Sequence, residues 1–260
     1  MKHLQKLCLC TIIIVSLLSC NSQGNVFDLS TQTFGIPSGT ITDQLVLAKY
    51  PMAKFVYYDS IIDAVIDVKM GNLSVAAYDE PLLRSLAANN PGLKVLDEKI
   101  TRDDYAFAVN KDNTVLLEKI DSAISKLLTN GIYYDEMKKR WLPEQGRARR
   151  MPAFNLSPTN GVLRFATAPV IEPFSFMDES GRIVGFDIEL ACMIALQLGM
   201  GLDIVQYEFG SLIHALQNNE VDVIGACITV SEERSEHVAF SIPYFEGGIG
   251  VIIRENNKKK

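Results

Sequence analysis

The alternation of short β-rich segments with helical segments constrains the fold of this chain most strongly. Residues 54–58 are rich in aromatic and β-branched residues, whereas residues 60–69 carry apolar side chains at the spacing of one helix face. Ser60 and Asp63 have the spacing of a capping box, and Gly71 is expected to end that helix. Strands and helices that alternate in this way predict an α/β fold with mostly parallel sheets covered by helices.

The same kind of periodicity predicts the remaining elements. A proline at position 81 favours the first turn of another helix, because proline has no N–H to leave unpaired there. We expect further strands over 33–36, 74–77, 105–110, 163–168, 202–206, 221–226 and 248–254, and further helices over 42–49, 114–128, 133–141, 187–198 and 211–217.

One local pattern occurs in both halves of the chain. Residues 60–65 read SIIDAV and precede a Gly-Asn stop and a strand, and residues 211–216 read SLIHAL and precede an Asn-Asn pair and a strand. Two copies do not make a solenoid, so the pattern predicts two similar α/β lobes. Ligands of such sheets bind at the carboxyl ends of strands, which favours a ligand in the cleft between the lobes.

The N-terminus has the pattern of a secretion signal. A short basic start precedes an apolar run over residues 7–18, which is shorter than the ~20 residues that a membrane-spanning helix needs. The run ends in the letters LLSC, which resemble the bacterial lipobox, whose cysteine is acylated. The resemblance implies a signal peptide over 1–19, lipidation of Cys20 and a tether over 20–30; a retained anchor helix is the alternative.

Composition excludes several classes of function. The formal net charge of −6 argues against nucleic-acid binding, which needs a concentrated basic face. Basic residues gather at 147–150 and 258–260, which we interpret as part of a linker and a tail. Beyond the signal, Cys192 and Cys227 remain, too few for a disulfide framework and without metal-ligand spacing. We expect no metal and no cofactor.

The last part of the chain carries an ordered set of motifs. They are PFSF at 173–176, GFDIEL at 185–190, VDVI at 221–224, ITVSEER at 228–234 and FSIPY at 240–244. This string resembles the first lobe of family 3 bacterial solute-binding proteins, the polar amino-acid binders of ABC transporters.

The earlier part resembles the second lobe of the same family. Its motifs are GIPSGT at 35–40, YDE at 78–80 and YAFAV at 105–109, and residues 130–141 resemble the family's closing helices. Because the family has these parts in the opposite order, the resemblance implies a two-lobed periplasmic-binding-protein-like fold of type II with circularly permuted lobes. Two truncated copies that pair with other chains are the alternative.

The resemblance also implies the boundaries of the parts. We expect a second-lobe equivalent over 31–108, closing helices that pack on the first lobe over 109–143, a linker over 144–160 and a first-lobe equivalent over 161–257. The two inter-lobe crossings are expected near 105–110 and after Arg254. A chain break at the second crossing would loosen the hinge.

The family's site residues map onto both lobes. Arg234 matches the carboxylate-binding arginine, whose planar fork meets a carboxylate in two places; a surface pair with Glu232 or Glu233 is the alternative. Thr229 and the backbone of Cys227 stand at the matching strand end. Across the cleft, Thr40 and the backbone of Ile41 precede a helix whose N-terminus favours an anion, although an ordinary N-cap fits as well.

The ammonium side of the site is implied in the same way. Asp79 matches the family's acidic residue, with a helix N-cap as its alternative. Tyr78 is expected to touch the ligand side chain, and Phe209 to form an apolar wall or part of the core. At two positions the chain departs from the family: Ala168 replaces a common Asp, and Ile171 stands at an aromatic lid position, so Glu172 is a candidate to compensate.

The predicted function is the extracytoplasmic binding of a small amino-acid-like solute by a lipid-anchored monomer, for delivery to an ABC transporter permease. Closure of two lobes on a shared ligand is the expected mechanism, without enzymatic activity. Two alternatives remain: a lyase similar to cyclohexadienyl dehydratase, with Glu172 or Glu246 as general acid, and a ligand-sensing module.

Overall fold

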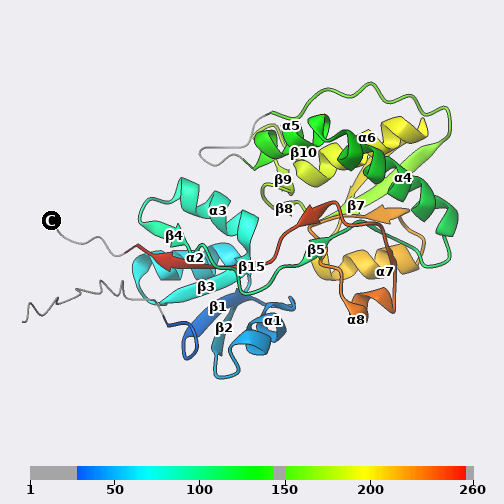
Figure 1. Ribbon diagram of the computed structural model, residues 1–260. Coiled ribbons are helices and arrows are strands. Elements are labelled where there is room, and N and C mark those ends of the chain that lie inside the picture. The colour runs from blue at the N-terminus through cyan, green and yellow to red at the C-terminus, as the bar shows by residue number, and fades with distance from the viewer. Residues whose placement is uncertain (1–27, 143–149, 256–260) are drawn as a thin grey trace, which may run out of the picture.

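Two five-stranded sheets form the cores of two lobes in this computed structural model, which describes residues 28–142 and 150–255 (Figure 1). The expected signal peptide, the lipidated Cys20 and parts of the expected tether and linker lie outside the described residues. Among the helices that the structure describes, none combines the length and the hydropathy needed to cross a membrane.

The small lobe contains a sheet in the strand order β2-β1-β3-β15-β4. Ser60 caps helix α2 as predicted, because its Oγ accepts from the backbone N–H of Asp63 at 3.3 Å, and Gly71 ends the helix with a left-handed φ of 85°. The elements of this lobe are β1 (Thr33–Pro37), α1 (Thr42–Lys49), β2 (Lys54–Tyr58), α2 (Ile61–Met70), β3 (Val75–Asp79), α3 (Glu80–Asn89), β4 (Leu93–Val95) and β15 (Ile249–Arg254).

The large lobe contains a sheet in the order β11-β7-β12-β6-β13 and a small antiparallel sheet of β8, β9 and β10. Its helices are α4 (Thr114–Asn130), α5 (Ile132–Trp141), α6 (Phe186–Leu198), α7 (Leu212–Gln217) and α8 (Glu232–Ser235), with a 3-10 turn η1 over Phe209–Ser211. Its strands are β6 (Ala108–Val109), β7 (Val162–Thr167), β8 (Val170–Ile171), β9 (Ser175–Met177), β10 (Ile183–Val184), β11 (Gly201–Gln206), β12 (Val223–Ile224) and β13 (Ala239–Phe240).

Both halves of the sequence contribute to the large lobe. Strand β6, from the earlier half, pairs with β12 and β13 from the later half. The helices α4 and α5 pack on α6 (Figure 1). The buried Glu189 of α6 fixes this packing, because it accepts hydrogen bonds from Tyr133 Oη at 2.7 Å, Arg140 Nη1 at 2.5 Å and Trp141 Nε1 at 2.5 Å.

The sheets are more mixed than the mostly parallel sheets that we expected. In each five-stranded sheet, two pairings are parallel and two are antiparallel. The antiparallel pairings in the small lobe come from β15, which we had placed in the unit over 161–257. Strand β15 lies instead between β3 and β4, so the later half of the chain also contributes to both lobes.

Two adjacent segments connect the lobes. The strands β5 (Asp104–Tyr105) and β14 (Phe245–Glu246) pair antiparallel, with Tyr105 opposite Phe245. The first crossing therefore lies where the sequence predicted it, whereas the second lies before β15 and not after Arg254.

The described residues at either end of the chain lead away from this hinge (Figure 1). Phe34 near the start of β1 and Ile253 near the end of β15 both pair with Val75, which places the two strands roughly 10 Å apart at that end of the sheet. Strand β15 follows β14 in the chain and leads away from the hinge within the small-lobe sheet, so the chain is continuous through both crossings (Figure 1). The expectation that a chain break loosens the second crossing is wrong.

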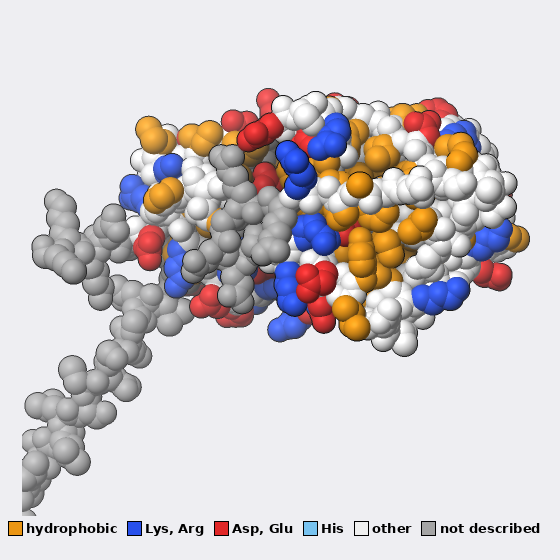
Figure 2. Space-filling view, turned by 90° about the horizontal axis from the view of Figure 1, so that it is seen from above, with side chains coloured by type: hydrophobic (Ala, Val, Ile, Leu, Met, Phe, Trp, Pro, Cys, Tyr) orange, Lys and Arg blue, Asp and Glu red, His pale blue; other side chains and the backbone are white. Residues whose placement is uncertain are grey.

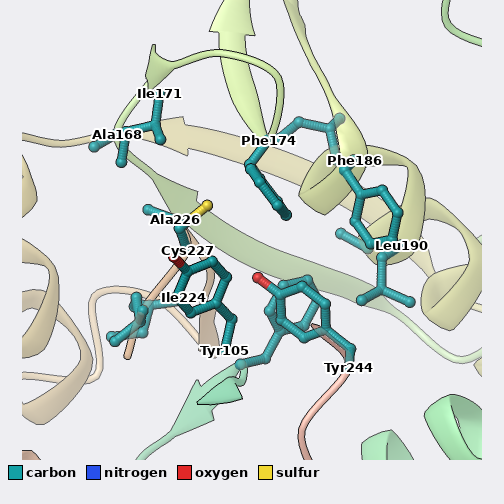
Figure 3. Packing of buried hydrophobic residues seen from close by; sticks show 14 of the residues in the cluster. Tyr105, Ala168, Ile171, Phe174, Phe186, Leu190, Ile224, Ala226, Cys227 and Tyr244 are labelled. Atoms are coloured by element: carbon teal, nitrogen blue, oxygen red, sulfur yellow. The ribbon is translucent and has the colours of Figure 1, made fainter. Parts of the chain in front are cut away.

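Aromatic packing surrounds the hinge (Figure 3). The Tyr105 ring meets Phe174 edge-on with centroids 5.8 Å apart and stacks on Phe245 at 5.9 Å. Phe186 and Tyr244 stack at 6.1 Å beside them. Because such pairs resist reorientation in a packed core, the hinge strands are held in one arrangement in this structure.

Charged side chains are mixed on the surface. On the face seen in Figure 2, basic side chains near the middle lie beside acidic ones, and hydrophobic side chains gather over the large lobe.

Candidate ligand-binding cleft

A small cavity lies between the two lobes, and most of the predicted site residues line it. Its volume is about 20 Å³, roughly the room that one water molecule needs, so the two walls meet closely in this structure. Among the described residues, the small lobe contributes Thr40, Ile41, Thr42, Leu45, Tyr78, Asp79 and Ile249, and the large lobe contributes Phe209, Cys227, Thr229 and Arg234.

Arg234 is held on the large-lobe wall. It lies in the short helix α8, which Ser231 caps by accepting from the Arg234 N–H at 3.2 Å. The guanidinium donates from Nη1 to the carbonyl of Thr229 at 3.0 Å, and its carbon lies 5.6 Å from the centre of the Phe209 ring. Burial lowers the pKa of Arg234, while the nearby charge of Asp79 acts in the opposite direction.

The surface alternative for Arg234 is not what the structure shows. Among the described residues, no ion pair within 4.0 Å joins Arg234 to Glu232 or Glu233. One of the five guanidinium donors is used by the Thr229 carbonyl, so the fork keeps donors for a carboxylate in the cavity.

Asp79 faces Arg234 from the small-lobe wall. It ends β3 and precedes α3, yet its side chain caps no N–H of that helix, so the N-cap alternative is not observed. Its Oδ1 accepts a 2.7 Å hydrogen bond from Tyr105 Oη, and the residue is 8% exposed. Burial raises the pKa of Asp79 to about 6, although the bond from Tyr105 and the charge of Arg234 act to lower it.

Tyr105 connects the two walls and was not predicted from the sequence. Its neighbours bind the large lobe, because Ala106 N donates to Ile228 O at 3.2 Å and Val230 N donates to Asp104 O at 2.9 Å. Its hydroxyl binds Asp79 of the small lobe. The Gly-Gly pair at 247–248 was the sequence feature that could have indicated a close neighbour. A Cβ at position 247 would lie 2.2–2.5 Å from atoms of the Tyr105 side chain, so only glycine leaves room for it.

The start of α1 forms the third side of the cavity. The residue before the helix is Ile41, and Thr40 lies one position earlier; its hydroxyl donates to Pro37 O at 3.1 Å and accepts from Thr42 N at 3.4 Å. Because Thr40, Ile41 and Thr42 all line the cavity, the positive end of the helix dipole faces it.

Cys227 lines the cavity without the role that we expected for its backbone. Its N–H donates to Asp187 Oδ2 at 2.9 Å, so that group already has a partner within the large lobe. Asp187 also accepts from Tyr244 Oη at 2.7 Å, and burial raises the pKa of Asp187 to about 7. Asp187 therefore supports the strand end behind the cavity.

Three residues considered from the sequence lie elsewhere. Ile171 is 3% exposed and packs in the core near Ala168 (Figure 3), because the β8–β9 pairing turns it inward beside Ser175. Glu172 lines a separate groove of about 700 Å³ beside α3, and Glu246 pairs with the exposed Arg102 at 3.0 Å.

The described residues contain no group of three or more His, Cys, Asp or Glu side chains that could hold a metal ion. Cys192 and Cys227 are both buried and unbridged. The chemistry available in the cleft is therefore that of one guanidinium, one carboxylate, hydroxyl groups, the Cys227 thiol and a helix N-terminus.

Comparison with known proteins adds a family match. Residues 163–260 match the model of the bacterial extracellular solute-binding proteins, family 3. Among curated proteins, the chain is 31% identical over 122 residues to ABC transporter arginine-binding protein 1 of Escherichia coli (strain K12), covering 45% of this chain and 50% of that protein. It is 29% identical over 98 residues to L-cystine-binding protein TcyJ of the same organism, covering 38% of this chain and 37% of that protein.

Other matches extend the comparison. The chain is 35% identical over 89 residues to cyclohexadienyl dehydratase of Pseudomonas aeruginosa, covering 34% of this chain and 33% of that protein. Among solved structures, the arginine-bound domain 1 from TmArgBP is 40% identical, with 38% of this chain and 84% of that chain covered and a TM-score of 0.33. The matches thus span half or less of the length of these curated relatives.

Proposed function

We propose that this chain, whose residues 163–260 belong to family 3 of the bacterial extracellular solute-binding proteins, binds a small amino-acid-like solute between its two lobes. The observation that supports this most directly is the pair formed by Arg234 and Asp79, which line one cavity from opposite lobes. An α-amino acid carries a carboxylate and an ammonium group, and these match the two side chains in charge.

The two lobes divide the recognition of the solute. Its carboxylate would face the Arg234 guanidinium and the start of α1, and its ammonium group would face Asp79. Because neither lobe holds both partners, the solute stabilises the closed arrangement by its higher affinity for it. A 20 Å³ cavity is too small for an amino acid, so the lobes must separate to admit one.

Delivery to a permease and membrane anchoring belong to the same proposal. Members of the family are extracytoplasmic binding proteins, and one relative is named as an arginine-binding protein of an ABC transporter. By analogy, the chain passes its solute to an ABC transporter permease as a monomer, anchored by a lipid on Cys20. The wild-type chain should incorporate labelled palmitate and the Cys20→Ser variant should not, and equal labelling of the two would contradict the anchor.

A single permuted domain is the arrangement that we infer from the strands. Each lobe contains strands from both halves of the sequence. The start of β1 and the end of β15 flank the same residue, Val75, so a short connection would join them. Two truncated copies of different domains would pair with other chains, so their strands are not expected to share sheets within one chain.

We infer binding without catalysis, in spite of the resemblance to a dehydratase. Among the described residues that line the cavity, Asp79 is the only carboxylic acid, because Glu172 and Glu246 lie elsewhere. In the proposed complex the ammonium group of the ligand occupies Asp79, so this acid is not free to donate a proton. Incubation with prephenate should give no product, and product formation that is lost in Asp79→Asn would overturn this inference.

Thermal unfolding in the presence of single amino acids tests the proposal. A solute at 100 times its dissociation constant should stabilise the chain by ~2.7 kcal/mol. Arg234→Gln should abolish the shift, whereas Arg182→Gln, which removes an exposed arginine paired with Asp178, should leave it unchanged. The proposal fails if no amino acid shifts the transition, or if Arg234→Gln responds as the wild type does.

A further inference from the structure

Few charges face the cavity between the lobes. Among the described residues that line it, Arg234 and Asp79 carry the charges. Both are matched by the carboxylate and the ammonium group that all α-amino acids share, so no charged group remains for the side chain of the ligand. The other lining residues are hydroxyl-bearing, thiol-bearing or apolar.

A larger cavity adjoins the first one. It has a volume of about 250 Å³ and shares Ile41, Phe209 and Arg234 with the small cavity. A ligand whose carboxylate meets Arg234 therefore has room for its side chain on the far side of Phe209. The volume is below the ~300–1,000 Å³ of pockets for drug-sized ligands, which suits a single amino-acid side chain. The remaining walls are Gly39, Gly210, Leu212, Ile213, Ile228, Glu233 and His237.

The charged groups of this second cavity do not favour a charged ligand. Glu233 and His237 are both exposed. Glu233 already acts on the Arg234 guanidinium, whose pKa it helps to raise. Because ion pairs between exposed groups contribute little, Glu233 should stabilise a cationic ligand side chain hardly more than water does. Leu212, Ile213 and Ile228 make the rest of the wall apolar.

We propose that the cleft selects an α-amino acid with a neutral, largely apolar side chain, which enters the second cavity beside Phe209. Arginine, lysine and glutamate are disfavoured, because each places a charge against apolar walls, where the exposed Glu233 is a weak partner for a cation and repels an anion. The inference rests on the proposed function and refines it, and it differs from the specificity that the names of the arginine-binding relatives suggest.

Isothermal titration of the full chain with four ligands tests the inference. L-Leucine and L-alanine represent neutral side chains, and L-arginine and L-glutamate represent the two charges. We expect leucine to bind at least tenfold more tightly than arginine and glutamate. A smaller preference, or tighter binding of either charged ligand, overturns the selectivity alone. Failure of all four ligands to bind overturns the inference, and it overturns the proposed function as well if no other amino acid shifts the thermal transition.

A substitution at Gly210 tests where the side chain lies. A Cβ at this position meets no heavy atom within 4 Å, so a larger residue can be added without a clash. Gly210→Leu fills part of the second cavity and should lower the ratio of leucine to alanine affinity at least tenfold. The smaller control Gly210→Ala should leave the ratio within threefold of the wild type. Equal ratios in the two variants would show that the side chain does not enter this cavity.

Discussion

Removing the hydroxyl group of Tyr105 should change the protonation of Asp79 in the cleft without changing the aromatic packing at the hinge. Tyr105 Oη donates to Asp79 Oδ1 at 2.7 Å, and Tyr105 itself is fully buried. Tyr105→Phe deletes this bond and keeps the ring that stacks on Phe245. Because the bond lowers the pKa of Asp79, its loss should raise that pKa above about 6.

The sign of the pH dependence follows from the charge that the ligand needs. The ammonium group binds the ionised form of Asp79, so affinity should be nearly constant above pH 6 and fall up to tenfold per pH unit below it. In Tyr105→Phe the midpoint of this fall should move to higher pH. A hydrogen bond to a charged group contributes ~1.5–3 kcal/mol, which corresponds to a rise of about one to two in the pKa of Asp79, so affinity at neutral pH should weaken by about two- to fifteenfold.

Titration calorimetry between pH 5 and pH 8, with the amino acid that binds most tightly, measures both effects. Tyr58→Phe is the matched control, because it removes a 2.8 Å hydrogen bond from a tyrosine to Asp67 in the same lobe but outside the cavity. The control should lower stability without moving the midpoint. An unmoved midpoint in Tyr105→Phe, or an equal movement in both variants, would refute the reasoning.

Three other substitutions have defined outcomes. Folding raises the pKa of Asp79 from 3.8 to about 6, so the ionised carboxylate lowers the free energy of unfolding by about 3 kcal/mol above pH 6, and this loss is absent at low pH. Asp79→Asn should therefore raise the melting temperature at pH 7.5 while abolishing binding. Glu189→Gln leaves the cation of Arg140 without its partner and should lower the free energy of unfolding in urea by ~3 kcal/mol. Gly247→Ala forces a Cβ into the Tyr105 ring and should cost about 1–3 kcal/mol in the same measurement.

Local patterns predicted the elements because their causes are local. Helix α1 and strand β2 have the predicted bounds, and α2 begins at the predicted cap, since a cap and an apolar face depend on residues within a few positions. Membership in a sheet depends on residues far away in the sequence. The apolar segment over 248–254 was correctly identified as a strand, but nothing in it specifies β3 and β4 as its neighbours.

The residues of the site also divide into those that local motifs predict and those that depend on contacts far away in the sequence. Sequence motifs located Arg234 and Asp79, which now line one cavity. They did not reveal that the hydroxyl of Tyr105 holds Asp79, or that Asp187 occupies the N–H of Cys227, because both depend on the packing of the hinge. Ile171 was misplaced for a related reason: its position in an alignment says nothing of the β8–β9 pairing that turns it into the core.

Restoring the lobe order of the family tests whether this chain is one permuted domain. The start of β1 and the end of β15 lie roughly 10 Å apart, a gap that about four glycine residues span. The variant would join residue 255 to residue 28 through these glycines and open between residues 154 and 158, where the chain has no regular secondary structure. Exchanging one connection for a shorter one should change the free energy of unfolding by only about 1 kcal/mol.

The same variant should keep the ligand affinity of the original chain, because both hinge crossings and all cavity residues stay in place. Its ability to fold as a monomer separates one domain from two truncated copies, since truncated copies joined in this way would still need partner chains. A soluble variant that forms dimers only, or that binds no ligand while the original chain does, would contradict a single permuted domain.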